Sequence, residues 1–390
     1  MTSTTNIVQR LPLCTELPPQ IPPPMALGRE ERERSSPNVS HQITLERIVS
    51  YWNNIGLVEL ASMWKLFILD HVHAVGYIPD RFATAAKWDR RLFQIDVKSR
   101  VVRLNPQSLQ QQDQDPVLVC NRAIVTFCEQ NRDISRFGVG IEAWLQENER
   151  FVRGTCKAPD YHPILTRRPD LEGLRLPSPI RGILGIATAG IHLNVYTMKG
   201  NDVDKVWVSR RGPNKAAYPG CYDQIVAGGM EPDDRRNPWL RLCHELIEEA
   251  GYITSGRHVY RQQHGGAKGR CVGEIEARVS TIYFRTQKDW TAGAAEDGHV
   301  EPGLRFCFDL CLEPEEHPEA NEADMEFSVL SVDDVKRSLQ SFRWKPNSGL
   351  VTLNFLLRKG LVESAADRRA ISSLAHEGLA LELPEFFSEY

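Results

Sequence analysis

The chain has 390 residues, of which 41% are hydrophobic and 25% are charged, and its formal net charge at pH 7 is −4. This length allows two or more domains with sizeable cores, and the composition is ordinary for a globular protein. The small negative charge argues against a general affinity for nucleic acid. The chain has no run of about 20 apolar residues, so it predicts no membrane span.

Nine cysteines are scattered along the chain, and the closest two, Cys307 and Cys311, lie in a strand-like run. No Cys or His pair follows at ligand spacing, so neither a zinc site nor a disulfide framework is indicated. We therefore expect reduced cysteines that mostly pack in the core of a cytoplasmic protein. The first 14 residues contain Arg10 and no acidic residue, which makes mitochondrial targeting the alternative.

Residues 1–41 are rich in Pro, Ser, Thr and charged residues, and they include the run LPPQIPPP at 17–24. Such a run favours polyproline II or a flexible linker. We expect a disordered Pro-rich tail here, with a proline-motif ligand as the alternative.

Residues 42–165 predict a separate, small α+β domain. A polar insertion at 107–115 interrupts it, and its Asp and His residues are too dispersed to form a catalytic constellation. The alternating run at 92–104 turns at Lys98-Ser99, which is typical of a hairpin. The other expected elements are helices at 43–55, 79–88 and 121–131, and strands at 64–69 and 74–78.

Two strands are predicted next, at 183–198 and 205–210. The second ends in a basic cluster that contains Arg210, Arg211 and Lys215. Because arginine suits bidentate contact with phosphate, the cluster is a candidate phosphate-binding site. A solvated strand end fits the spacing equally well.

The segment Pro238–Ala250 reads as one helix. Asn237 is a favourable N-cap, Pro238 suits the first turn, and Gly251 is a favourable C-terminal stop. An apolar stripe at spacings of four indicates the face that packs on a sheet. The stripe consists of Leu242, Leu246 and Ala250.

Three carboxylates lie on the same helix, at Glu245, Glu248 and Glu249. At about 100° per residue, the i, i+3 and i+4 positions share one narrow sector of the helix surface. Carboxylates this close raise one another's pKa values, and a hard divalent cation such as Mg²⁺ or Mn²⁺ relieves that repulsion. By itself the pattern also fits a solvated acidic face.

The flanking residues make the segment resemble the Nudix box, the signature of the Nudix hydrolases. That box runs Gly, five residues, Glu, seven residues, then Arg-Glu-hydrophobic-x-Glu-Glu-x-Gly-hydrophobic, and its end appears here as HELIEEAGY at 244–252. The resemblance implies a loop–helix–loop that holds Mg²⁺ against a diphosphate. It implies that Glu245, Glu248 and Glu249 are the metal ligands.

The segment departs from the Nudix box at two places. The family's Arg is His244 here, and a His lacks the planar fork with which that Arg holds the neighbouring Glu. The loop after Gly229 is longer than the box allows, and the upstream Glu has no clear counterpart. Asp233 and Asp234 are the candidate substitutes, and Arg236 stands near the expected place.

A wider resemblance covers residues 60–363. It rests on the runs HAVGYIP, RGILGIATAGIHLNVYT, KVWVSRRGPNKAAYPGCYDQIVAGG and FRWKPNSGLVTLNFLLRKGLV. These are similar to a fungal and plant Nudix subfamily with an extra N-terminal domain, related to thiamine pyrophosphokinase-associated Nudix proteins. The resemblance implies hydrolysis of thiamine diphosphate, or of its oxidised or damaged analogues, to monophosphates.

The same resemblance implies an architecture and a set of substrate contacts. We expect a Nudix α/β/α sandwich with a mixed sheet over 178–363, preceded by the small α+β domain, and a C-terminal helix and tail at 364–390. The family has a similar basic stretch before its glycine-rich segment, which favours phosphate binding by the cluster. The implied substrate-binding residues are Arg210, Arg211, Lys215, Asp223, Gly228 and Gly229.

Beyond the helix, the run GGAKGR at 265–270 lacks the ending of a phosphate loop and reads as a flexible turn. Strands are expected at 279–284 and 304–312, with a mobile insertion between them at 291–303. The resemblance places a further acid after these strands, as a metal ligand or base. Glu326 is the favoured candidate, Glu322 and Asp324 are its rivals, and an exposed turn is the alternative. Helices at 332–340 and 349–359 close the fold.

Together these features predict an Mg²⁺-dependent hydrolase of a small-molecule diphosphate. The metal would bridge the diphosphate oxygens and polarise an attacking water, and Glu245 or Glu326 would accept the proton. The alternatives are a Nudix hydrolase of nucleoside diphosphate derivatives and a catalytically weak Nudix-fold binding module. The oligomeric state is left open by the sequence.

Overall fold

The computed structural model describes residues 43–386, apart from 111–113, 135–137, 216, 235, 294, 322–323, 377, 379–380 and 382. The predicted tail at 1–41 and the candidate Glu322 therefore lie outside the described residues. No helix in the described part of the chain is long and apolar enough to cross a membrane.

The elements of the described chain are as follows. The helices are α1 (Leu45–Trp52), α2 (Leu57–Ser62), α3 (Asp80–Ala85), α4 (Pro116–Asn131), α5 (Gly138–Val152), α6 (Pro238–Ala250), α7 (Val332–Gln340), α8 (Pro346–Arg358) and α9 (Ala365–Ser373). The first strands are β1 (Trp64–Ile68), β2 (Gly76–Ile78), β3 (Phe93–Asp96), β4 (Val101–Leu104), β5 (Tyr161–Pro163), β6 (Arg175–Pro177), β7 (Thr188–Lys199) and β8 (Asp202–Arg210). The later strands are β9 (Tyr222–Asp223), β10 (Val226–Gly229), β11 (Tyr252–Ser255), β12 (His258–Gln262), β13 (Lys268–Gln287), β14 (Val300–Leu312) and β15 (Glu326–Ser331).

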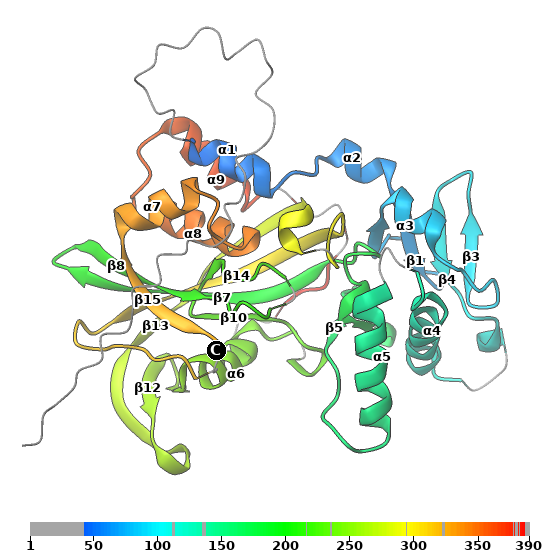
Figure 1. The fold of residues 1–390 in the computed structure, drawn as a ribbon, viewed down its shortest axis with the longest axis horizontal. Coiled ribbons are helices and arrows are strands. Elements are labelled where there is room, and N and C mark those ends of the chain that lie inside the picture. The colour runs from blue at the N-terminus through cyan, green and yellow to red at the C-terminus, as the bar shows by residue number, and fades with distance from the viewer. Residues whose placement is uncertain are drawn as a thin grey trace, which may run out of the picture. The chain divides into compact units, whose positions relative to one another are not determined.

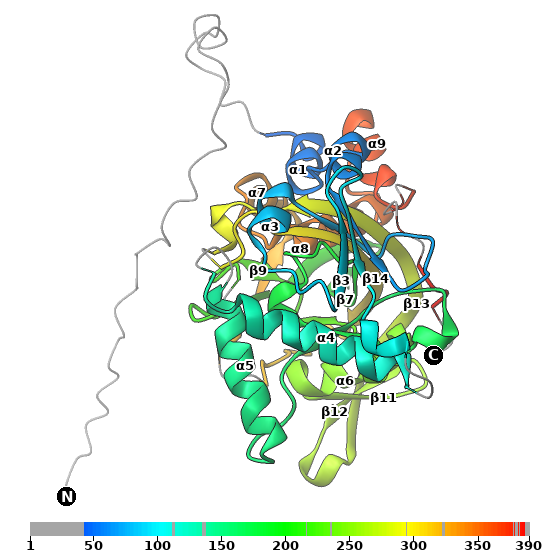
Figure 2. The ribbon, with the colours of Figure 1, turned by 90° about the vertical axis from the view of Figure 1, so that its right-hand side faces the viewer.

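A small four-stranded sheet comes first, in the order β2-β1-β4-β3. Strand β1 runs antiparallel to β2 and parallel to β4. The hairpin predicted at 92–104 is confirmed, because β3 and β4 pair antiparallel with Phe93 opposite Leu104. Helices α4 and α5 lie beside this sheet (Figure 2), and α4 contributes Cys120, Ile124 and Phe127 to its core. Helix α5 was not predicted.

The main sheet has the order β11-β12-β13-β14-β7-β8-β15, with β10 paired to β7 and β9 paired to β8. It is mixed because β14 and β7 run parallel, with Arg305 beside Gly190, while the other pairs are antiparallel. This parallel pair sets Arg305 next to the glycine-rich strand β10, whose Gly229 is the partner of Gly190.

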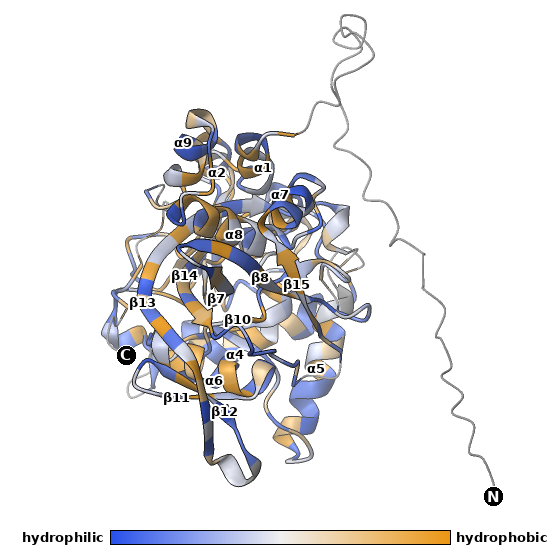
Figure 3. Ribbon diagram, turned by 90° about the vertical axis from the view of Figure 1, so that its left-hand side faces the viewer, coloured by the Kyte–Doolittle hydropathy of each residue, from blue (hydrophilic) through white to orange (hydrophobic). Residues whose placement is uncertain are grey.

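Helices cover both faces of the main sheet (Figure 1). Leu242 and Leu246 of α6 pack with Ile191 and Phe308 on one face. On the other face, α7 and α8 pack with Cys307 and further strand residues. Figure 3 shows hydrophobic residues along α6, which lies beneath the sheet, whereas the β12 strand is largely hydrophilic. The predicted α/β/α sandwich with a mixed sheet, preceded by a small α+β region, is confirmed.

Helix α1 joins the second of these cores rather than the core of the small sheet. Trp52 shares the core with Leu353 of α8 and Ile371 of α9. A Cβ at Gly349 of α8 would overlap the Trp52 ring, so the ring can pack on α8 at this point because residue 349 is a glycine. The segment before the small sheet thus completes one layer of the sandwich, while the predicted domain boundaries remain predictions.

The mobile insertion expected at 291–303 is wrong in its last part. Strand β14 begins at Val300 and pairs along its length with β13. His299 and Glu301 are both buried. Glu301 forms ion pairs with Lys288 and with Arg305. In the fold, Glu301 is neutralised by Lys288, just after β13, and by Arg305, four residues further along β14, which the polar sequence DGHVEPG alone did not show.

Candidate functional site

Helix α6 begins and ends where its sequence predicts. The Asn237 side chain accepts hydrogen bonds from the backbone N–H groups of Trp239 and Leu240, at 3.0 and 3.1 Å. Pro238 occupies the first turn, and Gly251 ends the helix in the left-handed region with φ 60°. These caps fix the register of the helix and hence the direction of its carboxylates.

The apolar stripe of α6 turns Glu245 toward strand β10. A Cβ at Gly228 would overlap the Glu245 carboxylate, so only glycine allows the helix to lie this close. The sequence resemblance implied that Gly228 contacts the substrate. In the structure the group that approaches is the Glu245 side chain.

Glu245 is buried and forms an ion pair with Arg241, one helical turn earlier. Arg241 also contacts Glu231 at 2.9 Å and lies 4.0 Å from Asp234. Burial raises the pKa of Glu245 to about 6, although Arg241 acts in the opposite direction and Glu248 adds to the rise. A cation near Glu245 would favour its charged form.

The other two carboxylates of the helix differ in their surroundings. Glu249 accepts a 2.7 Å hydrogen bond from the backbone N–H of Ala227 on β10, and Glu248 is exposed. Among the described residues, no three His, Cys, Asp or Glu side chains are gathered as metal ligands. The donor chemistry nevertheless fits a hard divalent ion, because carboxylate oxygens are its preferred ligands. The role of the three as metal ligands remains a prediction.

His244 does not take over the role of the Arg that it replaces. Its side chain is 49% exposed, and its Nδ1 lies 3.8 Å from a carboxylate oxygen of Asp234. Arg241 holds Glu245 instead, because residues four apart lie on the same helix face. The sequence analysis missed Arg241, although its i, i+4 spacing to Glu245 was a readable signal.

A cavity of about 180 Å³ lies on the other side of the β10 glycines. Gly229 lines it, whereas Gly228 faces Glu245. A Cβ at Gly229 would stand 3.4 Å from the His162 ring, which comes from β5. The polar residues that line the cavity are His162, Arg181, Thr188, Arg211, Tyr218, Thr286, Lys288, Glu301, Arg305, Lys345 and Asn347.

Three carboxylates pair with the basic residues of this cavity, namely Asp223, Glu296 and Glu301. Asp223 contacts Arg211 at 3.2 Å and Lys345 at 3.1 Å. Burial alone would raise the pKa of Asp223, but these two cations outweigh it and hold that pKa well below its usual range. Glu301 behaves in the same way beside Lys288 and Arg305, which lower its pKa despite burial.

The predicted substrate-binding residues divide into two groups. The structure brings Arg211 and Gly229 into the wall of the cavity and sets Asp223 behind it. Arg210 is exposed at the end of β8, and Lys215 pairs with Asp324 at 3.5 Å, so neither is among the residues that line the cavity.

Glu326, the predicted base, is exposed and begins the edge strand β15. In the strand register it lies opposite Arg210 of β8. Helix α6 packs instead against β7, β10 and β11. The catalytic role of Glu326 is untested by this geometry and remains a prediction.

Several residues of the cavity were missed by the sequence analysis. Arg305 sits inside an alternating apolar strand, where a charged residue that faces the core was a readable signal. Lys345 lies within a run that carried the family resemblance, but no spacing singled it out. Arg181 likewise opens a run that carried the family resemblance, without a pattern that marked it. His162 comes from a segment with no catalytic pattern, and the fold brings both residues to the cavity.

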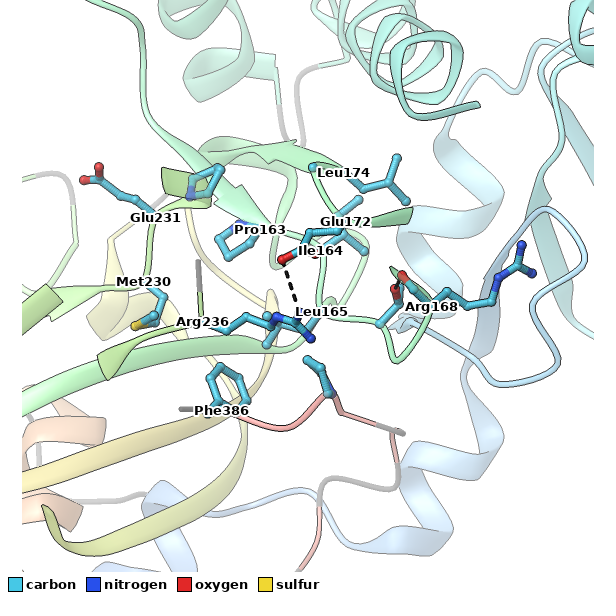
Figure 4. Close-up of a pocket in the computed structure, with 14 residues that line it drawn as sticks. Pro163, Ile164, Leu165, Arg168, Glu172, Leu174, Met230, Glu231, Arg236 and Phe386 are labelled. Carbon is cyan, nitrogen blue, oxygen red and sulfur yellow. Dashed lines mark hydrogen bonds and ion pairs between the residues drawn. The ribbon is translucent and has the colours of Figure 1, made fainter. Parts of the chain in front are cut away.

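A second, smaller cavity lies at the loop between β10 and α6 (Figure 4). Its lining includes Pro163, Met230 and Phe386, and its volume is about 50 Å³. An ion pair of 3.2 Å between Arg236 and Glu172 stands at this cavity. Arg236, which stands near the place expected for the upstream Glu of the box, thus pairs with an acid from outside the box.

Comparison with known proteins gives distant relatives. No family model matches the chain. The chain is 29% identical over 226 residues to an uncharacterized protein of Saccharomyces cerevisiae. The matched stretch covers 57% of this chain and 57% of that protein. It is 25% identical over 191 residues to the chloroplastic Nudix hydrolase 20 of Arabidopsis thaliana, covering 48% of this chain and 43% of that protein. Nudix hydrolase 24 of the same plant is 25% identical over 193 residues, covering 48% and 44%.

The chain thus spans between 43% and 57% of the length of these curated relatives. Solved structures give weaker likenesses. A NUDIX hydrolase from Nitrosomonas europaea has a TM-score of 0.28 and 13% identity, covering 46% of this chain and 98% of that one. The Ap4A hydrolase of C. elegans has a TM-score of 0.27 and 10% identity, covering 45% and 96%.

Proposed function

We propose that this chain, a relative of the Nudix hydrolases, cleaves the diphosphate bond of a small molecule with the help of Mg²⁺ or Mn²⁺. The observation that carries the proposal is the pair of features on either side of the β10 glycines. Glu245 lies against Gly228 on one side, and a cation-lined cavity borders Gly229 on the other. Carboxylates for a metal and cations for phosphate are the two requirements of diphosphate hydrolysis.

The chain's own residues supply binding, orientation and proton transfer. A divalent metal on Glu245, Glu248 and Glu249 would neutralise charge on the diphosphate and activate water. Arg241 orients Glu245, and the Ala227 N–H orients Glu249. Glu245 or Glu326 would accept the proton of the attacking water.

We propose thiamine diphosphate or its oxidised analogues as the substrate, since the sequence resemblance favours them. Nucleoside diphosphate derivatives are the alternative, because the fold alone does not select a substrate. A cytoplasmic location and a small-molecule partner are part of the same proposal. In the described residues, the carboxylates of α6 are not brought together as a set of metal ligands. This favours a second candidate function, a binding module with weak or no turnover.

Product analysis with Mg²⁺ and a substrate panel tests this proposal. The panel contains thiamine diphosphate, its oxo and oxy analogues, ADP-ribose, NADH and nucleoside triphosphates. We expect monophosphate products from the thiamine compounds in preference to the others. If only nucleotides are cleaved, the thiamine substrate is wrong and nucleoside diphosphate derivatives take its place in the proposal. If ligands bind and none is cleaved, the protein is the binding module and not the enzyme.

Matched variants test the metal ligands. We expect Glu248→Gln and Glu249→Gln to lower kcat by orders of magnitude without changing the unfolding midpoint, because each removes a charged ligand. Glu147→Gln, which makes the same change on the exposed face of α5, is the control and should retain full activity. Full turnover by either α6 variant would contradict the metal assignment.

A further inference from the structure

Two residues of the cavity come from chain segments that precede the main sheet. His162 belongs to β5, and Arg181 follows the short helix Ser178–Ile180. The His162 ring nitrogen Nε2 lies 3.0 Å from the Ser178 hydroxyl and 3.4 Å from the Arg181 guanidinium. The cavity therefore has one wall from the sandwich and one wall from the segment before it.

The charges around the cavity do not balance. Its lining contains five basic side chains, and the described carboxylates paired with them are Asp223, Glu296 and Glu301. Burial lowers the pKa of His162 to about 3, so this ring is neutral at pH 7. Five cations against three carboxylates leave a formal excess of two positive charges. Such an excess in a buried site is costly unless an anion joins it.

The basic side chains are held with unequal strength. Lys288 and Arg305 are only 4% and 8% exposed and are closely paired with Glu296 and Glu301. Arg181, Arg211 and Lys345 are 23%, 20% and 21% exposed. Arg181 has the longest contacts, because its hydrogen bonds to Glu296 and His162 are both 3.4 Å. Arg211 is also anchored by two hydrogen bonds to the Ala217 carbonyl, at 3.0 and 3.3 Å. Each of the three side chains still has N–H groups beyond those used in these contacts, and these can donate to a ligand.

The size of the cavity limits the ligand. Its volume of about 180 Å³ lies below the roughly 300–1,000 Å³ of sites that enclose a whole small molecule. A single group with two negative charges matches both the volume and the charge excess. Arginine binds such tetrahedral oxyanions through two parallel hydrogen bonds.

We propose that this cavity binds a terminal phosphoryl group, with Arg181, Arg211 and Lys345 as its ligands. The segment between β6 and β7 thereby supplies a specificity-determining residue, Arg181. This site has a consequence for substrates, which rests on the proposed function. The enzyme should favour diphosphate monoesters over disubstituted diphosphates. Only a monoester ends in a phosphoryl group with two charges.

Phosphate binding without metal tests the site directly. The full chain is titrated with inorganic phosphate in EDTA by calorimetry, and its unfolding midpoint is measured in phosphate and in acetate at equal ionic strength. We expect saturable binding of phosphate and a higher midpoint in phosphate than in acetate, since a ligand bound to the native state stabilises it.

Variants locate the site. Arg181→Gln should weaken phosphate binding by about tenfold to a hundredfold, the range for hydrogen bonds to a charged group. Arg175→Gln is the matched control, because Arg175 is an exposed arginine of the same segment outside the cavity lining. Lys345→Gln repeats the test from the opposite wall. The site is refuted if the wild type gains no stability from phosphate, or if Arg181→Gln binds phosphate as tightly as Arg175→Gln.

Turnover tests the substrate class separately. In the wild type we expect a higher kcat/KM for thiamine diphosphate and ADP than for ADP-ribose, and Arg181→Gln should remove that preference. Phosphate binding without hydrolysis would keep this site and defeat the proposed function. Hydrolysis without phosphate binding would keep the function and defeat this site.

Discussion

At the scale of single residues, Arg241 compensates for the presence of His244 in place of an arginine. The Nudix-like segment lacks the Arg that normally precedes Glu245, yet the structure supplies a guanidinium from one turn earlier. Because Arg241 also contacts Glu231, it ties the start of the loop to the helix. The departure at His244 thus leaves Glu245 with a positioning partner.

This assignment predicts opposite results at the two positions. Arg241→Gln should reduce kcat at least tenfold and lower the free energy of unfolding by about 3 kcal/mol, since it leaves a buried carboxylate without its cation. His244→Ala, at an exposed position, should retain activity within about twofold. Steady-state kinetics and urea denaturation of both variants decide this. A larger loss at His244 than at Arg241 would reverse the assignment.

A buried histidine gives the stability a dependence on pH. His192 lies 2.7 Å from the Gln224 side-chain oxygen, and burial lowers the pKa of His192 to about 3. In the unfolded chain a histidine titrates near 6.5. Between these values the unfolded state binds the proton and the folded state does not. The free energy of unfolding therefore falls as the pH drops from 6.5 toward 3.

Replacing His192 should reduce this dependence. Between pH 7 and pH 5 the wild type should lose roughly 1–2 kcal/mol more than His192→Gln, at about 1.4 kcal/mol per pH unit below 6.5. Glutamine keeps a donor for Gln224. Urea denaturation at both pH values measures the difference, and the exposed His258→Gln serves as control. Identical losses in wild type and His192→Gln would show that His192 does not titrate as described.

At the scale of elements, local signals predicted the bounds of two helices, whereas helix α5 and several strands were missed. The caps Asn237 and Gly251 gave α6 its observed bounds, and α7 was also predicted with its bounds. Strands β11 and β12 were missed because their polar residues, such as Arg261, lack clear alternation. The start of β14 was missed because the pairing of Glu301 with Lys288, across the turn between β13 and β14, forms only in the fold.

The site follows the same division. The α6 carboxylates could be read from one helix, because i, i+3 and i+4 spacing needs no tertiary information. The cavity could not, since Arg181, Lys288 and Lys345 are separated by long stretches of sequence. Arg211 was found only through its neighbours in the basic cluster.

The contact between α1 and α8 yields a prediction at this scale. Gly349→Ala should lower the free energy of unfolding by about 1–3 kcal/mol, because its methyl group would enter the Trp52 ring. Gly378→Ala adds the same methyl group where nothing lies within 4 Å and should be nearly neutral. Thermal unfolding of the two variants provides the comparison, and equal midpoints would argue against tight packing of α1 on α8.

At the scale of the whole molecule, the small sheet and the sandwich meet through backbone contacts. Strand β2 forms an isolated bridge between Gly76 and Ile186, and the Tyr77 N–H donates to the Gly185 carbonyl at 3.0 Å. Phe82 of α3 packs on the His299 ring, with centroids 5.4 Å apart. The cavity wall that carries Arg181 lies in the segment joining the two parts, so this junction also positions the proposed phosphate site.

A substitution in the junction should therefore affect stability and phosphate binding together. Gly185 has φ 56°, and its Cβ would overlap the Tyr77 carbonyl, so Gly185→Ala meets strain from both causes. We expect the unfolding midpoint to fall by several degrees and phosphate to bind at least tenfold more weakly, because Arg181 follows the displaced backbone. Gly200→Ala, also at positive φ but in open space, separates the two causes. It should lower the midpoint slightly and leave phosphate binding unchanged. If Gly185→Ala bound phosphate like the wild type, the junction would not position Arg181, and the two parts would act independently.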